Sequence, residues 1–136
     1  MEAIADTSFV VAILNRHETV HEKAVHIFKQ YHVIGLPQTV LAEVCYMIGA
    51  RVGVKAVISF LRNIPNSRFV LQPIDVQDVN AISLLLEQYA DSRIDFVDVS
   101  VMVLAEKHNV ATILTLDQRD FSLVKSNKFA YFQLLP

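Results

Sequence analysis

The chain alternates short β-rich runs with longer runs of helical hydrophobic periodicity from one end to the other. Strands are predicted at residues 2–5, 33–36, 69–74, 112–115 and 131–134. Helices are predicted at residues 8–14, 19–31, 39–51, 54–64, 78–89 and 96–108. Strands that alternate with helices need crossover connections, which produce a parallel sheet covered on both faces. The sequence therefore predicts an α/β fold, a three-layer α/β/α sandwich around a mainly parallel sheet.

Length and composition narrow the class of protein further. With 136 residues, 53% of them hydrophobic and 19% charged, we expect a single domain over residues 1–136 rather than a disordered chain. The longest apolar run near the start, residues 9–14, is far shorter than the ~20 residues of a membrane-spanning helix. No cationic stretch of a secretion signal opens the chain, and the lone Cys45 cannot form an internal disulfide. We expect a cytoplasmic protein with no membrane partner.

A few of the fourteen acidic residues lie inside otherwise apolar stretches. They are Asp6 in IADTSFVVAIL, Glu43 in VLAEVCYMI, Asp95 and Asp98 in RIDFVDVSVMVL, and Asp117 in TILTLDQRDF. Burying an unpaired carboxylate costs several kcal/mol, so such groups are paired, protonated or bound to a cation.

The positions of these acids predict that they meet. Asp6 and Asp117 each follow a predicted strand, and ligands bind at the carboxyl ends of the strands in open parallel sheets. Glu43 has apolar residues three, four and seven positions away, which predicts an otherwise apolar helix face around it. Asp98 begins the helix at residues 96–108. Carboxylates gathered at one sheet edge would make an all-oxygen site, of the kind that Mg²⁺ or Mn²⁺ selects.

Each acid taken alone also has a purely structural interpretation. Asp6 can cap the helix that begins near residue 8, and Asp95 with Asp98 can form a capping box. Glu43 lies in the middle of a helix, where capping is no explanation. Four such residues in one small chain favour a shared metal site.

Four segments resemble, in order and spacing, the acidic motifs of the PIN-domain family, most closely its VapC-type toxins. They are IADTS, the helix that contains Glu43, DFVDVSVMVLAE and ILTLDQRDF. The resemblance covers essentially the whole chain and implies a PIN-like fold and Mg²⁺- or Mn²⁺-dependent cleavage of RNA. It also implies two protein partners, a cognate antitoxin and a second copy of the chain in a homodimer.

The resemblance implies roles for individual residues. The catalytic and metal-binding acids would be Asp6, Glu43, Asp98 and Asp117. The secondary candidates would be the further acids Asp95 and Asp120 and the small polar residues Ser8 and Thr115.

Two other features bear on binding. The net charge of −2 is no overall signature of nucleic-acid binding, but Arg16, Arg51, Lys55, Arg93 and Arg119 are candidates for local phosphate contacts. The helices at 39–51 and 54–64, with Phe60 and Leu61, carry more apolar surface than one sheet face needs. This excess fits a homodimer and an antitoxin groove, or ordinary core.

Three other functions stay open. Residues 17–21 spell HExxH, the zinc-protease signature, but they have polar neighbours and no evident third ligand. A receiver-type phosphoacceptor domain shares the small α/β size, the strand-end aspartates and Mg²⁺. Against it, no acidic pair follows the first strand and no lysine follows a late strand. The third is a PIN-like module that binds RNA or a protein without cleavage.

Overall fold

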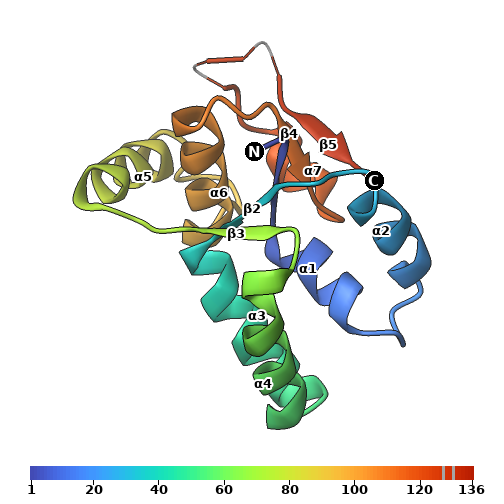
Figure 1. Ribbon diagram of the computed structural model, residues 1–136. Coiled ribbons are helices and arrows are strands. Elements are labelled where there is room, and N and C mark those ends of the chain that lie inside the picture. The colour runs from blue at the N-terminus through green and yellow to red at the C-terminus, as the bar shows by residue number, and fades with distance from the viewer. Residues whose placement is uncertain (127, 130) are drawn as a thin grey trace.

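A five-stranded sheet forms the centre of the computed structural model, which describes residues 1–126, 128–129 and 131–136 (Figure 1). The strands are β1 (Ala3–Ala5), β2 (Ile34–Pro37), β3 (Phe69–Gln72), β4 (Thr112–Leu114) and β5 (Gln133–Leu135). Their order is β3-β2-β1-β4-β5, and every neighbouring pair is parallel. The predicted mainly parallel sheet is confirmed.

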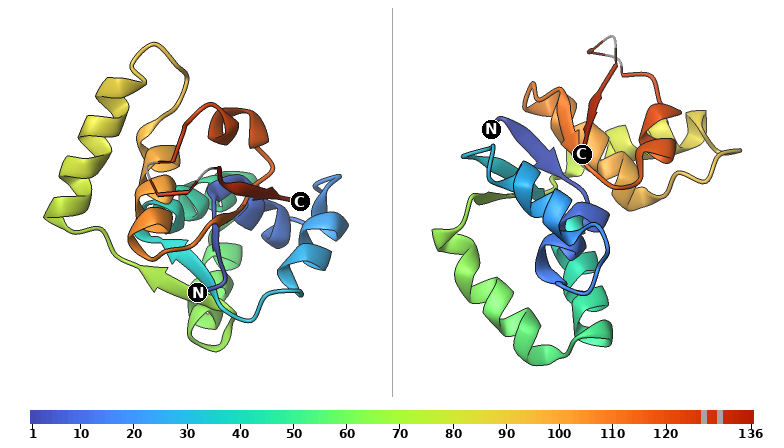
Figure 2. Two further views of the ribbon diagram at one scale, coloured as in Figure 1. Left: turned by 90° about the horizontal axis from the view of Figure 1, so that it is seen from above. Right: turned by 90° about the vertical axis from the view of Figure 1, so that its right-hand side faces the viewer.

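Helices cover both faces of this sheet (Figure 1 and Figure 2). The described residues form α1 (Thr7–Leu14), α2 (His21–Phe28), α3 (Gln38–Arg51), α4 (Val54–Asn63), a 3-10 turn η1 (Ile64–Asn66), α5 (Val76–Gln88), α6 (Phe96–Lys107) and α7 (Gln118–Ser122). Helices α1 and α2 lie on one side and α5 and α6 on the other, while α3 and α4 project as a hairpin. The three-layer α/β/α architecture is confirmed.

The strand order creates a switch point beside β1. From β1 the chain steps outward to β2 and β3, and then returns through α5 and α6 to β4 on the other side of β1. In open parallel sheets, ligands bind at the carboxyl ends of the two strands that flank such a reversal. Asp6 directly follows β1, and its backbone N–H donates to the carbonyl of Leu114 in β4 at 3.0 Å.

Helix α6 packs against the strands that form this edge. It packs against β1, β2 and β4, and its Val99, Val101, Met102 and Leu104 are buried. Because so much of its circumference is buried, α6 has a fixed position relative to the sheet. No helix in the described part of the chain is long and apolar enough to cross a membrane.

Some predicted boundaries are wrong in detail. Helix α2 begins at His21 rather than residue 19, because residues 15–20 form turns. Helix α3 begins at Gln38 without a side-chain cap, since the hydroxyl of Thr39 contacts Ser100 instead. Helix α7 was not predicted, and the last strand begins two residues later than predicted.

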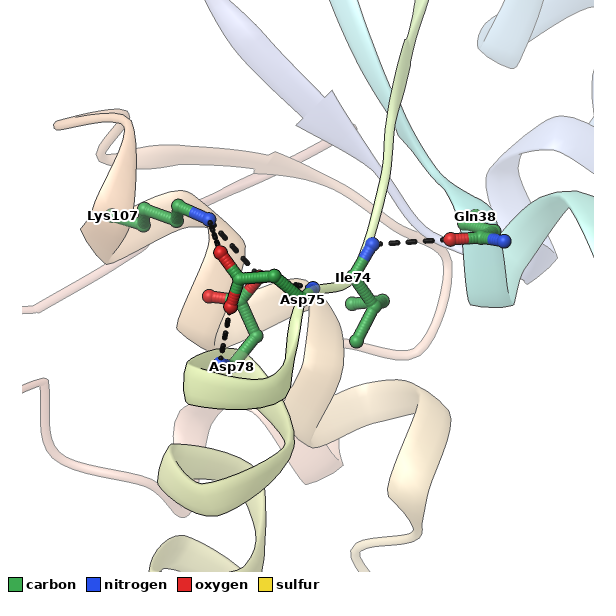
Figure 3. A network of polar contacts seen from close by, with 5 residues as sticks. All are labelled: Gln38, Ile74, Asp75, Asp78 and Lys107. Atoms are coloured by element: carbon green, nitrogen blue, oxygen red, sulfur yellow. Dashed lines mark hydrogen bonds and ion pairs between the residues drawn. The ribbon is translucent and has the colours of Figure 1, made fainter.

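Helix α5 begins with a capping box whose two carboxylates both pair with one lysine of the neighbouring helix (Figure 3). Asp75 accepts a hydrogen bond from the N–H of Asp78 at 2.8 Å, and Asp78 accepts one from the N–H of Asp75 at 3.0 Å. Lys107 Nζ of α6 lies 3.0 Å from a carboxylate oxygen of each acid. The Asp78 N–H and then Lys107 lower the pKa of Asp75. This network ties the start of α5 to the end of α6.

Candidate active site

The carboxylate of Asp6 lies buried at the centre of the sheet edge, with 4% of the residue exposed. It is the N-cap of α1: its Oδ1 accepts hydrogen bonds from the N–H of Phe9 at 3.0 Å and from Ser8 Oγ at 2.8 Å. Its Oδ2 accepts a hydrogen bond from Thr115 Oγ1. The capping interpretation of Asp6 is therefore confirmed, and it accounts for only part of the contacts of this carboxylate.

Ser8 and Thr115 connect the ends of β1 and β4. Ser8 Oγ accepts a hydrogen bond from the N–H of Leu116 at 3.0 Å, and Thr115 Oγ1 accepts one from the N–H of Asp117 at 2.8 Å. Each hydroxyl thus donates to Asp6 and accepts from the segment that follows β4. The turn that carries Asp117 is fixed relative to Asp6 by these two side chains.

Asp95 and Asp98 form the capping box that the sequence predicts at the start of α6. Asp95 accepts a hydrogen bond from the N–H of Asp98 at 2.9 Å, and Asp98 accepts one from the N–H of Asp95 at 3.4 Å. Asp95 is exposed and Asp98 is half-buried. The buried body of α6 sets the position of Asp98 at the sheet edge.

Negative charges disfavour one another at this edge. Burial raises the pKa of Asp6 to about 6, against the hydrogen bonds of Thr115, Phe9 and Ser8, and the charge of Asp117 adds to the rise. Burial, followed by the charge of Asp95, raises the pKa of Asp98 to about 7, and Asp6 contributes as well. Asp6 is therefore within electrostatic reach of both Asp98 and Asp117.

The two capping boxes of the protein differ in their counter-charge. Lys107 lies beside Asp75 and Asp78 at the start of α5. Across the described ranges, no lysine, arginine or histidine forms an ion pair with Asp6, Asp95, Asp98 or Asp117. Lys107 thus offsets part of the negative charge of one capping box, whereas the other capping box has no cationic partner among the described residues.

Asp117 is the N-cap of α7, and Asp120 lies in the first turn of this helix. Burial and Asp117 raise the pKa of Asp120, whereas the charges of Arg119 and Arg93 act in the opposite direction. These two arginines therefore lie near Asp120. The other basic candidates are elsewhere: Arg51 pairs with Glu18 at 3.5 Å, and Lys55 lies in the projecting hairpin.

The predicted apolar helix face around Glu43 is only partly confirmed. Helix α3 buries the stripe of Val40, Val44 and Ile48, and Glu43 lies half-buried beside it, while Tyr46 is 78% exposed. The helix face around Glu43 is therefore not uniformly apolar. Glu43 forms no hydrogen bond or ion pair with the described residues, so no direct contact joins it to Asp6 or Asp98.

The carboxylate oxygens at this sheet edge are suitable ligands for a hard divalent cation, although they do not surround a single position. Carboxylate oxygens from Asp6, Asp98 and Asp117 are the ligand type that Mg²⁺ and Mn²⁺ prefer. Within the described residues, no three Asp, Glu, His or Cys side chains come close enough together to hold a metal ion.

The HExxH segment does not form a zinc site. His17 and Glu18 lie in the turns before α2, and only His21 is helical. Glu18 pairs with Arg51, and His21 Nδ1 lies 2.7 Å from the carbonyl oxygen of Ala12. The two histidines therefore do not share a helix face.

Sequence comparisons agree on a family. The family model described as PIN domain matches residues 3–126. The chain is 29% identical over 134 residues to Ribonuclease VapC26 of Mycobacterium tuberculosis, which covers 98% of this chain and 99% of that protein.

Solved structures agree on the fold. VapC20 of Mycobacterium tuberculosis, described as a sarcin-ricin loop cleaving toxin, has a TM-score of 0.75 at 19% identity over 82% of this chain and 86% of that one. The structure of VapBC2 from Rickettsia felis, bound to a DNA fragment from its promoter, has a TM-score of 0.71 at 17% identity. The match covers 98% of this chain and 97% of that one. At these identities the similarity shows the fold alone.

The raised pKa values predict how the metal-free protein responds to pH. Between the ordinary aspartate pKa of 3.8 and the folded pKa of about 7 for Asp98, the native state binds more protons than the unfolded state. The free energy of unfolding of the wild type should therefore fall relative to that of Asp98→Asn as pH rises through this range. Urea unfolding of both proteins in EDTA measures the difference.

Asp75→Asn is the control for this measurement, because the pKa of Asp75 is lowered. The stability that Asp75 contributes is lost on acidification, so its difference from wild type should change with pH in the opposite direction. A wild type that gains stability relative to Asp98→Asn as pH rises would contradict the prediction.

Proposed function

The chain belongs to the PIN-domain family, and on this premise we propose that it is a metal-dependent endoribonuclease, the toxin of a toxin–antitoxin pair. The observation that carries the proposal is the group of acids without a counter-charge at the switch point of the sheet. The naming of its relative VapC26 as a ribonuclease supports the choice of RNA as substrate. The family match also favours this function over a receiver-type phosphoacceptor domain.

In the proposed site, Asp6, Asp98, Asp117 and Glu43 would hold Mg²⁺ or Mn²⁺. The bound ion would lower the pKa of a water molecule and stabilise the charge that develops on the phosphate. Ser8 and Thr115 orient Asp6 by donating to its two oxygens. Asp95 fixes the first turn of α6 and thereby the position of Asp98.

Arg93 and Arg119 are the basic residues best placed to contact the RNA backbone in this proposal. Both are exposed, and both act electrostatically on Asp120 beside Asp117. Contacts from arginine to phosphate position a nucleic acid without reading its sequence. They would hold the RNA chain against an edge whose carboxylates otherwise repel it.

Substitution of the four acids tests the proposal. Asp6→Asn, Asp98→Asn, Asp117→Asn and Glu43→Gln should each reduce the rate of RNA cleavage about 100-fold or more, because each removes charge that stabilises the reacting centre. Asp95→Asn should have a milder effect than Asp98→Asn. The assay is incubation of total RNA with purified protein in Mn²⁺ or in EDTA, followed by mapping of the RNA ends.

Asp78→Asn is the matched control, because Asp78 has the same capping-box position on α5 that Asp98 has on α6. It should destabilise the protein without loss of cleavage. Undiminished cleavage by the Asp98→Asn variant, or cleavage by the wild type in EDTA, would contradict the metal-dependent mechanism. A wild type that binds RNA without cleaving it would favour the non-cleaving alternative, in which Glu43 stays apart from the other acids.

A homodimer is the second part of the proposal, and the hairpin of α3 and α4 supports it. Exposed apolar residues gather there: Tyr46, Val52, Val54, Ile58 and Leu61. Phe60 is only 7% exposed and belongs to the core, which agrees with the ordinary-core alternative for this residue. These exposed apolar side chains form the surface through which we propose that two copies of the chain meet.

Light scattering tests the dimer at tens of micromolar protein. The wild type should have the mass of two chains, and Tyr46→Glu, which places a charge on this exposed apolar surface, should have the mass of one. Tyr131→Glu is the control, because Tyr131 is 76% exposed, almost as much as Tyr46, and is distant in sequence from the hairpin. A monomeric wild type would contradict the dimer.

An antitoxin segment is the proposed occupant of an apolar groove beside α4. The groove has a volume of about 300 Å³, and its walls include Ile13, Leu14, Phe28, Ile48, Ala56 and Phe60. It lies away from the acids, so a segment bound there would anchor a partner whose other parts reach the site. An amphipathic helix is the kind of segment that binds such a groove.

Ala56→Arg tests this groove, because it introduces a long charged side chain among the apolar walls. The variant should cleave RNA at the rate of the wild type, yet escape inhibition when the purified antitoxin is added. Lys55→Ala, one residue earlier and outside the walls, should remain inhibited. Full inhibition of Ala56→Arg would exclude the groove as the anchor.

A further inference from the structure

Two hydroxyl groups form a polar bridge between α3 and α6. Thr39 Oγ1 in the first turn of α3 lies 2.5 Å from Ser100 Oγ in α6. Ser100 is fully buried, whereas Thr39 is half-buried. In the described part of the chain, this is the only hydrogen bond that joins the two helices.

The chemistry of the bridge assigns its direction. Ser100 Oγ donates its single proton to the carbonyl oxygen of Val97 at 2.6 Å, so it has only lone pairs to offer Thr39. Thr39 therefore donates to Ser100. Both hydroxyls are satisfied in an otherwise apolar contact, where an unpaired hydroxyl would be costly.

The bridge joins the N-terminal parts of the two helices that carry Glu43 and Asp98. Glu43 is four residues after Thr39 and therefore on the same face of α3, about 6 Å along the helix axis. Asp98 is two residues before Ser100 and therefore on a different face of α6, so the bridge acts on it through the position of the helix. Because Glu43 forms no hydrogen bond or ion pair of its own with the described residues, only the position of α3 sets its distance from Asp98.

We infer that Thr39 and Ser100 are positioning residues that hold the α3 acid, Glu43, at a fixed distance from the α6 acid, Asp98. The inference rests on the proposed function, since it concerns the same metal-binding acids. Val40, Val44 and Ile48 hold the body of α3 by apolar packing, so without the bridge only the first turn of α3, and Glu43 after it, would shift slightly relative to α6. The expected result is a lower affinity for the metal ion, as when other groups that orient metal ligands are removed.

Three substitutions and one titration test the inference. Thr39→Val and Ser100→Ala remove one hydroxyl each, and we expect each to weaken Mn²⁺ binding about tenfold or more, as measured by calorimetry without RNA. The rate constant kcat for RNA cleavage should fall, while KM for RNA stays the same. Thr39→Ser keeps the hydroxyl and should restore both. The double variant should bind Mn²⁺ no more weakly than the worse single variant, because both changes break one link.

Thr112→Val is the matched control. Thr112 also donates to a side chain of another element, Gln133 at 3.1 Å, but it does so at the start of β4, away from the acids. It should leave Mn²⁺ affinity unchanged even if it lowers the melting temperature. If the wild type binds Mn²⁺ and the Thr39→Val and Ser100→Ala variants bind it equally well, the inference is overturned and the proposed function stands. If the wild type neither binds Mn²⁺ nor cleaves RNA, both are overturned.

Discussion

The carboxylate of Asp6 is buried at the end of the central strand, and the elements that meet there are connected through it. One oxygen caps α1, and the other accepts a hydrogen bond from Thr115 after β4. A buried carboxylate is stable only when such donors replace its hydration. The requirement that Asp6 be satisfied therefore fixes the start of α1, the end of β4 and the turn that carries Asp117 relative to one another.

The two capping boxes show how tertiary structure gives one local motif two different properties. Asp75 with Asp78 and Asp95 with Asp98 cap their helices with the same hydrogen bonds. Lys107 reaches the first pair, whereas Asp6 lies near the second, so the negative charge of one pair is partly offset and the acids of the other repel their neighbours. Capping and metal binding are thus compatible explanations of Asp98, not alternatives.

The strand–helix alternation was predictable because apolar periodicity records which face of each element is buried. Asp6 and Asp117 were predictable as neighbours because parallel strands end at one edge. Side-chain contacts and exposure that depend on residues distant in sequence could not be predicted from the sequence alone. Thr39 has a capping residue's identity, yet its hydroxyl bonds Ser100, sixty-one positions away. The apolar neighbours of Glu43 in sequence did not reveal that Tyr46 is exposed. Ser100, a polar residue inside an apolar run, was the available sign of a buried partner.

The pairing of β1 with β4 has a consequence for the order in which the protein is made. Asp6 leaves the ribosome before Thr115, which satisfies its second oxygen and follows 109 positions later. Contacts between such distant segments form only after the intervening chain has been synthesised. A nascent chain that has not yet reached β4 carries the first acid without the strand beside it, so the sheet edge is completed only after β4 has been synthesised.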